Sequence, residues 1–137
     1  MSAPVERGII MRKAHFPGRA PIDAYGNGGF RFAGMSHRGS ILCLPSAIVG
    51  WSAPMPFDDS SALTPAHLAD VLAEVSALAF LLIGTGRRQI FPSREVRQAF
   101  REAGIGIDVM DTGAACRTYN VLLAEGRPLA AALVAVD

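Results

Sequence analysis

The chain has 137 residues, of which half are hydrophobic and 18% are charged, and its formal net charge is +1. A chain of this length fits one domain, which buries about two-thirds of the surface that its unfolded form exposes. The near-neutral balance excludes a general attraction to nucleic acid or to an anionic membrane. The longest apolar runs, at 77–83 and 129–136, are far shorter than the ~20 residues of a membrane-spanning helix. We therefore expect a soluble domain without a transmembrane segment and without nucleic-acid partners.

The cysteine pattern argues against a metal centre. Cys43 and Cys116 are far apart in the sequence, and neither belongs to a CxxC motif or to a Cys/His cluster with metal-ligand spacing. We expect no metal, no cofactor and a reducing, cytoplasmic location. The N-terminal segment lacks the long apolar stretch of a signal peptide. We expect residues 1–15 to form a mobile arm or an edge strand and residues 16–137 to form a single domain.

The first third of the chain has the pattern of β structure. Glycines separate short extended segments such as 30–33 and 40–44, which predicts a twisted hairpin assembly. A further short strand is predicted at Ile48, Val49 and Trp51. The segment 52–63 then forms a long loop or crossover.

The chain beyond residue 63 alternates between helical and strand patterns. Thr64 and Pro65 form an N-cap and first-turn pair, which predicts a helix over 65–76. The apolar run at 80–83 is typical of a strand that is buried on both faces, and we expect it at the centre of the sheet. Ser93 is placed to cap a second helix.

Gly104 ends that second helix, and 105–110 is the next predicted strand. Strand, helix and strand in this order form a right-handed crossover, so the two strands should be parallel and end at the same edge. A third helix over 112–125 ends at Gly126, and a final apolar strand covers 129–136. The second half therefore has the order βαβαβ.

Ordered motifs connect the chain to a known family. They are LLIGTG at 81–86, VMDT at 109–112, AACRTYN at 114–120 and EGR at 125–127, together with GSILCLP at 39–45. With Trp51, these motifs resemble the MTH-type family of uncharacterised domains over roughly residues 20–136. The resemblance implies an α/β fold: a three-layer single domain with a central mixed sheet, an N-terminal β-hairpin element and about three helices.

The resemblance also implies a kind of function. The better-described members act through protein partners as assembly or regulatory proteins, so we expect a non-enzymatic interaction or assembly factor with protein partners. By the same resemblance, the process is respiratory complex I biogenesis where the organism has that complex. No catalytic residues follow from the family, and an enzymatic activity stays open. A homodimer formed through a strand edge also stays open.

A second hypothesis comes from the place where the two parallel strands end. Ligands of α/β sheets favour the carboxyl ends of strands, and a helix start attracts anions through its free N–H groups. We therefore predict a small-molecule or anion site, either for binding or for catalysis, with free N–H groups at 112–114. The alternative is that the glycines serve turns and that Thr112 is an ordinary helix cap. The predicted site residues are Gly84, Thr85, Gly86, Arg88, Asp111, Thr112 and Gly113.

Two regions are candidates for a partner surface. Trp51, Met55 and Phe57 lie in a Pro-rich connection, and aromatic and Met side chains dominate interface energetics. Alternatively, these three side chains fold back over the sheet as a lid on the core. On the third helix, the 100° spacing places Arg117 and Asn120 opposite the apolar arc. Asn120 alternatively bonds to a loop backbone.

Two other patterns have structural interpretations. His67, Asp70 and Glu74 share one helix face, a geometry that permits metal ligation or acid–base work, but a solvated polar face is the simpler interpretation. Cys116 lies on the inward arc of the third helix. We expect it to be a small buried hydrophobe rather than a nucleophile.

Overall fold

The computed structural model describes residues 15–54 and 62–137. The strands are β1 His15–Phe16, β2 Ile22–Gly26, β3 Gly29–Phe32, β4 Met35–Arg38, β5 Ser40–Cys43, β6 Ile48–Trp51, β7 Phe80–Gly84, β8 Gly106–Met110 and β9 Leu129–Leu133. The helices are α1 Ala69–Leu72, α2 Arg94–Glu102 and α3 Thr112–Ala124, with short 3₁₀ turns at Pro65–Leu68 and Val75–Ala77.

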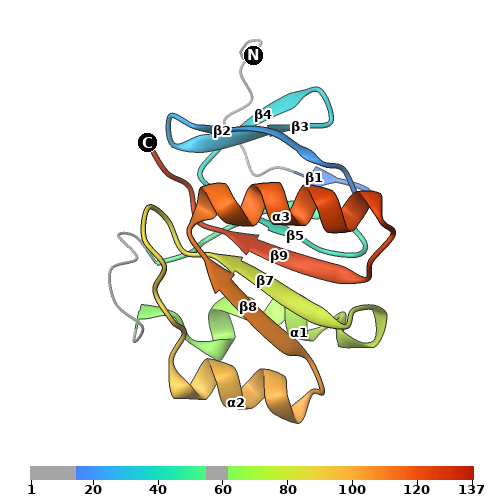
Figure 1. Ribbon diagram of the computed structural model, residues 1–137, viewed down its shortest axis with the longest axis vertical. Helices are drawn as coiled ribbons and strands as arrows, with labels where there is room; N and C mark the ends of the chain where they lie inside the picture. Colours follow the sequence, from blue (N-terminus) through green and yellow to red (C-terminus); the bar gives the residue numbers. More distant parts are fainter. Residues whose placement is uncertain (1–14, 55–61) are drawn as a thin grey trace, which may run out of the picture.

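The described strands form two sheets. The large sheet has the order β1-β6-β5-β9-β7-β8, and the small sheet has the order β2-β3-β4. Strand β7 is parallel to both β8 and β9, whereas the other pairings are antiparallel. The large sheet is therefore mixed. Helix α3 and the small sheet lie on one side of it, and α1 and α2 lie on the other (Figure 1). The expected three-layer α/β domain is confirmed.

The large sheet separates two hydrophobic cores. Successive residues of a strand point to opposite faces, so Leu82 and Ala131 face the α3 side while Leu81 and Ala132 face the α2 side. All five residues of β9 are buried. On the α3 side the strand presents Ala131 between Leu129 and Leu133, whereas Ala130 and Ala132 belong to the core on the α2 side.

The small sheet is built by two tight hairpins. Asn27 and Gly28 connect β2 to β3 with φ values of +52° and +77°, and Ala33 and Gly34 connect β3 to β4 with +52° and +75°. Two central residues with positive φ form the type I′ turn, whose twist matches that of paired strands. The predicted hairpin assembly of the first third is confirmed.

Two expectations for the second half are wrong. The predicted helix over 65–76 is interrupted at Leu68 and Glu74, which leave helical geometry. Tertiary context overrides local helix propensity here, and at the second break the Glu74 carboxylate accepts hydrogen bonds from the Ser46 backbone N–H and hydroxyl at 3.1 and 2.6 Å. Strand β7 is also not at the centre of the sheet. It lies one strand in from the edge, because β9 inserts between β5 and β7.

The other helix boundaries agree with the sequence. The Ser93 hydroxyl accepts a hydrogen bond from the Val96 N–H at 3.3 Å and caps α2. Gly104 and Gly126 follow α2 and α3 with positive φ, as expected of helix ends. Of the predicted N-terminal arm, residues 1–14 lie outside the described part, and His15 pairs with Val49 in β1.

Candidate functional site

The ends of β7 and β8 meet, as the parallel arrangement predicts. The Thr112 backbone N–H donates to the Gly86 carbonyl at 2.8 Å, and the Gly86 N–H donates to the Thr112 hydroxyl at 2.9 Å. The Thr85 N–H donates to the Met110 carbonyl at 2.9 Å. We call residues 84–86 and 111–113 the junction. Its two segments are joined directly to each other by hydrogen bonds.

The two threonine hydroxyls at the junction are buried and fully engaged. The Thr112 hydroxyl donates to the Val134 carbonyl at 2.7 Å while it accepts from Gly86. The Thr85 hydroxyl donates to the Arg88 carbonyl at 2.5 Å and accepts from the Ile90 N–H at 3.0 Å. These hydroxyls therefore hold the protein's own backbone rather than a ligand.

The start of α3 is also occupied by the chain itself. Asp111 is the N-cap, and its Oδ1 accepts from the Ala114 N–H at 2.9 Å. The expectation of free N–H groups is therefore wrong for Thr112 and Ala114, and the helix cap is Asp111 rather than Thr112. A carboxylate already complements the positive end of the helix, which disfavours a second anion there.

The glycines of the junction permit close packing. A Cβ atom at Gly84 would lie 3.0 Å from both Thr112 Cα and Ala115 Cβ, so a side chain there would push α3 away from β7. A Cβ atom at Gly113 would lie 2.5 Å from the Tyr25 hydroxyl oxygen. Gly86 has a φ of +100°, which a turn requires. The turn role weighed for the glycines is supported at Gly86, whereas Gly84 and Gly113 are required by close packing, which the sequence did not indicate.

The predicted partner residues have different surroundings. Trp51 is buried, and its indole N–H donates to the His67 carbonyl at 2.7 Å. It therefore packs into the core, as the lid alternative predicts for this residue. Met55 and Phe57 lie outside the described residues. Arg117 is exposed on α3. The structure thus leaves Arg117 open to solvent and places Trp51 inside.

Asn120 joins α3 to the small sheet. Its Oδ1 accepts from the Ile22 N–H and its Nδ2 donates to the Ile22 carbonyl, both at 2.8 Å. These two hydrogen bonds are of the kind that a neighbouring strand would make, and they satisfy backbone groups at the edge of β2. Asn120 therefore bonds to backbone, as the alternative proposed, although the backbone is that of strand β2 rather than of a loop.

An exposed apolar residue of α3 was missed from the sequence. Val121 follows Arg117 by four residues, so the two side chains share one side of α3, and Val121 is 58% exposed. A helical-wheel count of apolar residues outside the inward arc would have found it. We call Arg117 and Val121 the outward face of α3.

Cys116 and His67, which the sequence offered as residues with possible chemistry, both have structural roles in the fold. Burial raises the pKa of Cys116 to about 12, so its thiol is neutral at ordinary pH, as the core interpretation predicts. The His67 ring nitrogen Nδ1 accepts from the Thr64 N–H at 3.0 Å. Within residues 15–54 and 62–137, no cluster of three or more His, Cys, Asp or Glu residues has the arrangement of a metal site.

The family model described as protein of unknown function (DUF498/DUF598) matches residues 22–134. The chain belongs to this family. A solved structure similar to this DUF498/DUF598 chain is a solution structure from Bordetella pertussis described as a Mth938-like domain. It is 28% identical, has a TM-score of 0.64, and the match covers 85% of each chain. The MTH-type resemblance is confirmed.

Two further relatives of this DUF498/DUF598 chain carry descriptive names. A crystal structure described as an outer membrane protein from Bartonella henselae is 53% identical with a TM-score of 0.80, and covers 89% of this chain and 99% of that one. NADH dehydrogenase (ubiquinone) 1 alpha subcomplex assembly factor 3 of Mus musculus is 31% identical over 92% of this chain. That match spans 66% of the mouse protein, just under two-thirds of its length.

The membrane question has one structural finding. Across the part of the chain that the structure describes, none of the helices has the length and apolar composition for crossing a bilayer.

Proposed function

We propose that this chain is a non-enzymatic interaction or assembly protein that takes part in respiratory complex I biogenesis. The observation that carries the proposal is the 31% identity to a complex I assembly factor over 92% of the chain. The junction supports it, because the polar groups there are engaged in holding the fold. The neutral, buried thiols of Cys43 and Cys116 support it as well.

We propose that the outward face of α3 contacts a protein partner. Val121 exposes more than half of its apolar side chain beside the exposed guanidinium of Arg117. An apolar residue next to an arginine is typical of the centre of a protein interface. The chemistry fits a partner surface with an apolar pocket beside a carboxylate.

The alternative function, a small-molecule or anion-binding protein or enzyme at the junction, has weaker support. The N–H groups of Gly86, Thr112 and Ala114 already have acceptors, and the Asp111 carboxylate repels anions. If the junction did bind an anion, the Thr112→Ala and Arg88→Ala variants would abolish a ligand-induced rise in melting temperature.

We also propose that the protein works in the cytoplasm. Its two cysteines are free and buried, which fits a reducing compartment. Cell fractionation tests this: recovery of the chain in the membrane fraction after a high-salt wash contradicts a cytoplasmic location.

The function is tested by deleting the gene in its own host and measuring complex I by native gel electrophoresis with an NADH dehydrogenase activity stain. We expect less of the complete complex and an accumulation of smaller subassemblies. Re-expression of the wild-type chain should restore the complex. An unchanged amount of complete complex I in the deletion strain would refute the proposed function.

The surface is tested separately in the same strain. Val121→Asp should fail to restore the complex, because it puts a charge into the apolar contact. The matched control is Val121→Thr, which keeps the branched shape and should restore most of it. Both variants should melt at the wild-type temperature, because Val121 is exposed. Full restoration by Val121→Asp would remove the surface proposal and leave the function standing.

A further inference from the structure

The small sheet has a solvent-facing side made of small residues and two arginines. The register pairs Ala24 with Arg31 and Arg31 with Ser36 across the three strands, so these side chains lie on the same face. Gly26, Gly29 and Arg38 share that face, because side chains alternate along a strand. We call this set the outer face. Its opposite side carries Phe30 and Phe32 into the core.

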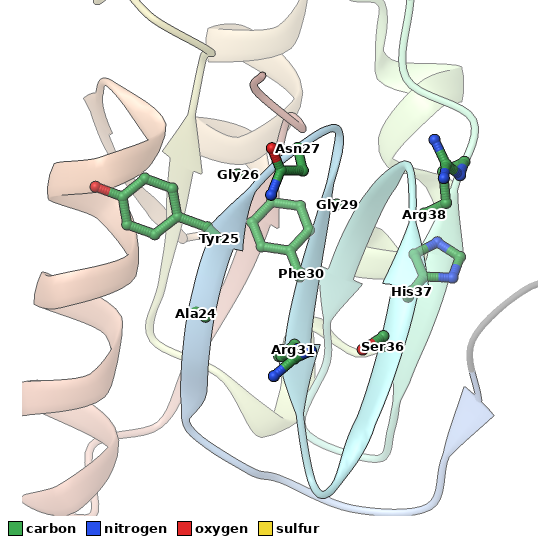
Figure 2. A pocket seen from close by; sticks show the side chains of 10 residues that line it. All are labelled: Ala24, Tyr25, Gly26, Asn27, Gly29, Phe30, Arg31, Ser36, His37 and Arg38. Carbon is green, nitrogen blue, oxygen red and sulfur yellow. The ribbon is translucent and has the colours of Figure 1, made fainter. Parts of the chain in front are cut away.

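A hollow of about 510 Å³ opens beside this face (Figure 2). The side chains along β2 and β3 at its floor are small: Ala24, Gly26 and Gly29 give little or no bulk. Side chains at the ends of the strands surround it, with Asn27 at the β2–β3 turn and Arg38 at the end of β4. Pockets for small molecules have volumes of about 300–1,000 Å³, so the hollow has the size of a ligand site.

The charged side chains that line the hollow are positive. Arg31 and Arg38 are both exposed, and they are diagonal neighbours because Arg38 lies two residues beyond Ser36, the partner of Arg31. None of the ten residues that line the hollow is acidic. Within the described residues, neither arginine forms a salt bridge. Long side chains at diagonal positions of neighbouring strands are within reach of one another, and an anion between the two guanidinium groups would offset their repulsion.

The donors around the hollow suit a tetrahedral anion better than a planar one. A single guanidinium satisfies both oxygens of a carboxylate through its fork of N–H groups. Here the two guanidinium groups belong to different strands, Arg31 to β3 and Arg38 to β4, and Ser36 is the cross-strand partner of Arg31. The Asn27 amide adds a neutral donor at the rim. A phosphate group has enough oxygens to use donors from several directions.

We infer that this hollow binds the phosphate group of a phosphate-bearing molecule, with Arg31 and Arg38 as its two charged ligands. The site belongs to a different sheet from the junction, and it does not depend on the proposed assembly function. The phosphate can belong to a dissolved small molecule or to a lipid headgroup, since the arginines recognise the same chemistry in both.

The test is an NMR titration of the isotope-labelled full chain with inorganic phosphate and with glycerol 3-phosphate. We expect the backbone signals of Arg31, Ser36 and Arg38 to shift with saturation. Arg31→Ala and Arg38→Ala should each weaken binding by about tenfold or more, as for the loss of a charge-assisted hydrogen bond. Arg101→Ala removes an equal charge from the exposed side of α2 and should leave the affinity unchanged.

A second variant tests the shape of the hollow. Ala24→Leu keeps both arginines but places bulk on the outer face, and it should also weaken phosphate binding. Equal affinity in the wild-type chain and in the Arg31→Ala/Arg38→Ala double variant would overturn the inference. Succinate binding as tightly as phosphate, with the same dependence on the arginines, would overturn the choice of phosphate.

Sedimentation with lipid vesicles distinguishes a lipid headgroup from a dissolved molecule as the source of the phosphate. Phosphatidylcholine vesicles with and without phosphatidic acid are sedimented with the wild-type chain and with the double variant. Binding that requires both phosphatidic acid and the two arginines supports the site with a lipid headgroup as its ligand. Binding to glycerol 3-phosphate alone supports it with a dissolved ligand. The inference is wrong if neither probe binds in a way that depends on Arg31 and Arg38.

Discussion

The junction and the outer face contain similar residue types but differ in how their polar groups are used. At the junction, the hydroxyls of Thr85 and Thr112 are buried and bonded to the chain's own backbone. On the outer face, Arg31 and Arg38 point into solvent around a hollow without acidic residues. Glycines and polar residues at a strand end are therefore not sufficient evidence for a ligand site. Such residues have a structural role when their hydrogen bonds are made within the protein, and they are available to a ligand when those bonds are not.

The junction holds three distant parts of the chain together. Thr112 begins α3, Gly86 follows β7, and the Val134 carbonyl follows β9, and a single hydroxyl bonds to the last two. Breaking that link should cost more than any change on the outer face. The following predictions run from the largest expected effect to the smallest.

Thr112→Val should lower the free energy of unfolding by about 2–3 kcal/mol, because the Gly86 N–H loses its acceptor and the Val134 carbonyl loses its donor in a buried place. Urea denaturation measures the change. Thr112→Ser is the matched control, since it keeps the hydroxyl, and it should recover most of the loss. Equal stability of the valine variant and the wild type would mean that the junction is not a structural link.

Gly84→Ala should cost about 1–3 kcal/mol, because the new methyl group would overpack the contact between β7 and α3. Gly106→Ala in β8 is a control in the neighbouring strand, where the methyl group would have ordinary contact distances at 3.8 Å. It should change stability much less. A similar effect of the two substitutions, measured by thermal denaturation, would contradict the close packing at Gly84.

Asn120→Ala should cost about 1–2 kcal/mol, because both hydrogen bonds to Ile22 are lost at the β2 edge. Arg117→Ala, on the same helix, should stay within about 0.5 kcal/mol of the wild type, since an exposed side chain contributes little to folding. This pair separates a structural residue from a surface residue on α3. A larger loss for Arg117→Ala than for Asn120→Ala would reverse that assignment.

The smallest effect concerns His37, which lines the hollow from the buried side. Burial lowers its pKa below the ordinary value of 6.5, while a backbone hydrogen bond with Ser40 partly opposes the shift. The folded state therefore binds this proton less tightly than the unfolded state does. The stabilisation is present above the unfolded pKa, and it is lost as the pH falls from 6.5 towards the lower folded value.

His37→Gln should therefore flatten the pH dependence of the free energy of unfolding below 6.5, even if it shifts stability by a constant amount. Urea denaturation of both proteins at several pH values gives the two slopes. Identical slopes would show that His37 does not contribute to the acid dependence.

Local sequence signals predicted the features that depend on neighbouring residues. Ser93 and Gly104 bound α2 as expected, because a cap and a positive-φ glycine act within a few residues. The meeting of the β7 and β8 ends was also predictable, since it follows from the order strand, helix, strand. The family motifs gave the three-layer arrangement.

Features that depend on distant partners could not be predicted in this way. Nothing near Glu74 in the sequence indicates its bonds to Ser46, which lie at the point where the expected helix is interrupted. The Thr112 hydroxyl donates to the Val134 carbonyl, which follows β9 and is distant from Thr112 in the sequence. The outer face was missed as well, although the alternation of small and charged residues around Arg31 carries its signal, because its recognition needs the strand register.

Native-state hydrogen exchange of the Gly86 and Thr112 amides tests the central claim most directly, namely that the junction is closed internally and serves the fold. These buried N–H groups should exchange only through global unfolding, at a rate that saturating phosphate does not selectively change relative to other globally protected amides. Fast exchange at either amide, or protection that phosphate increases specifically at the junction, would contradict the account and restore the junction as a ligand site.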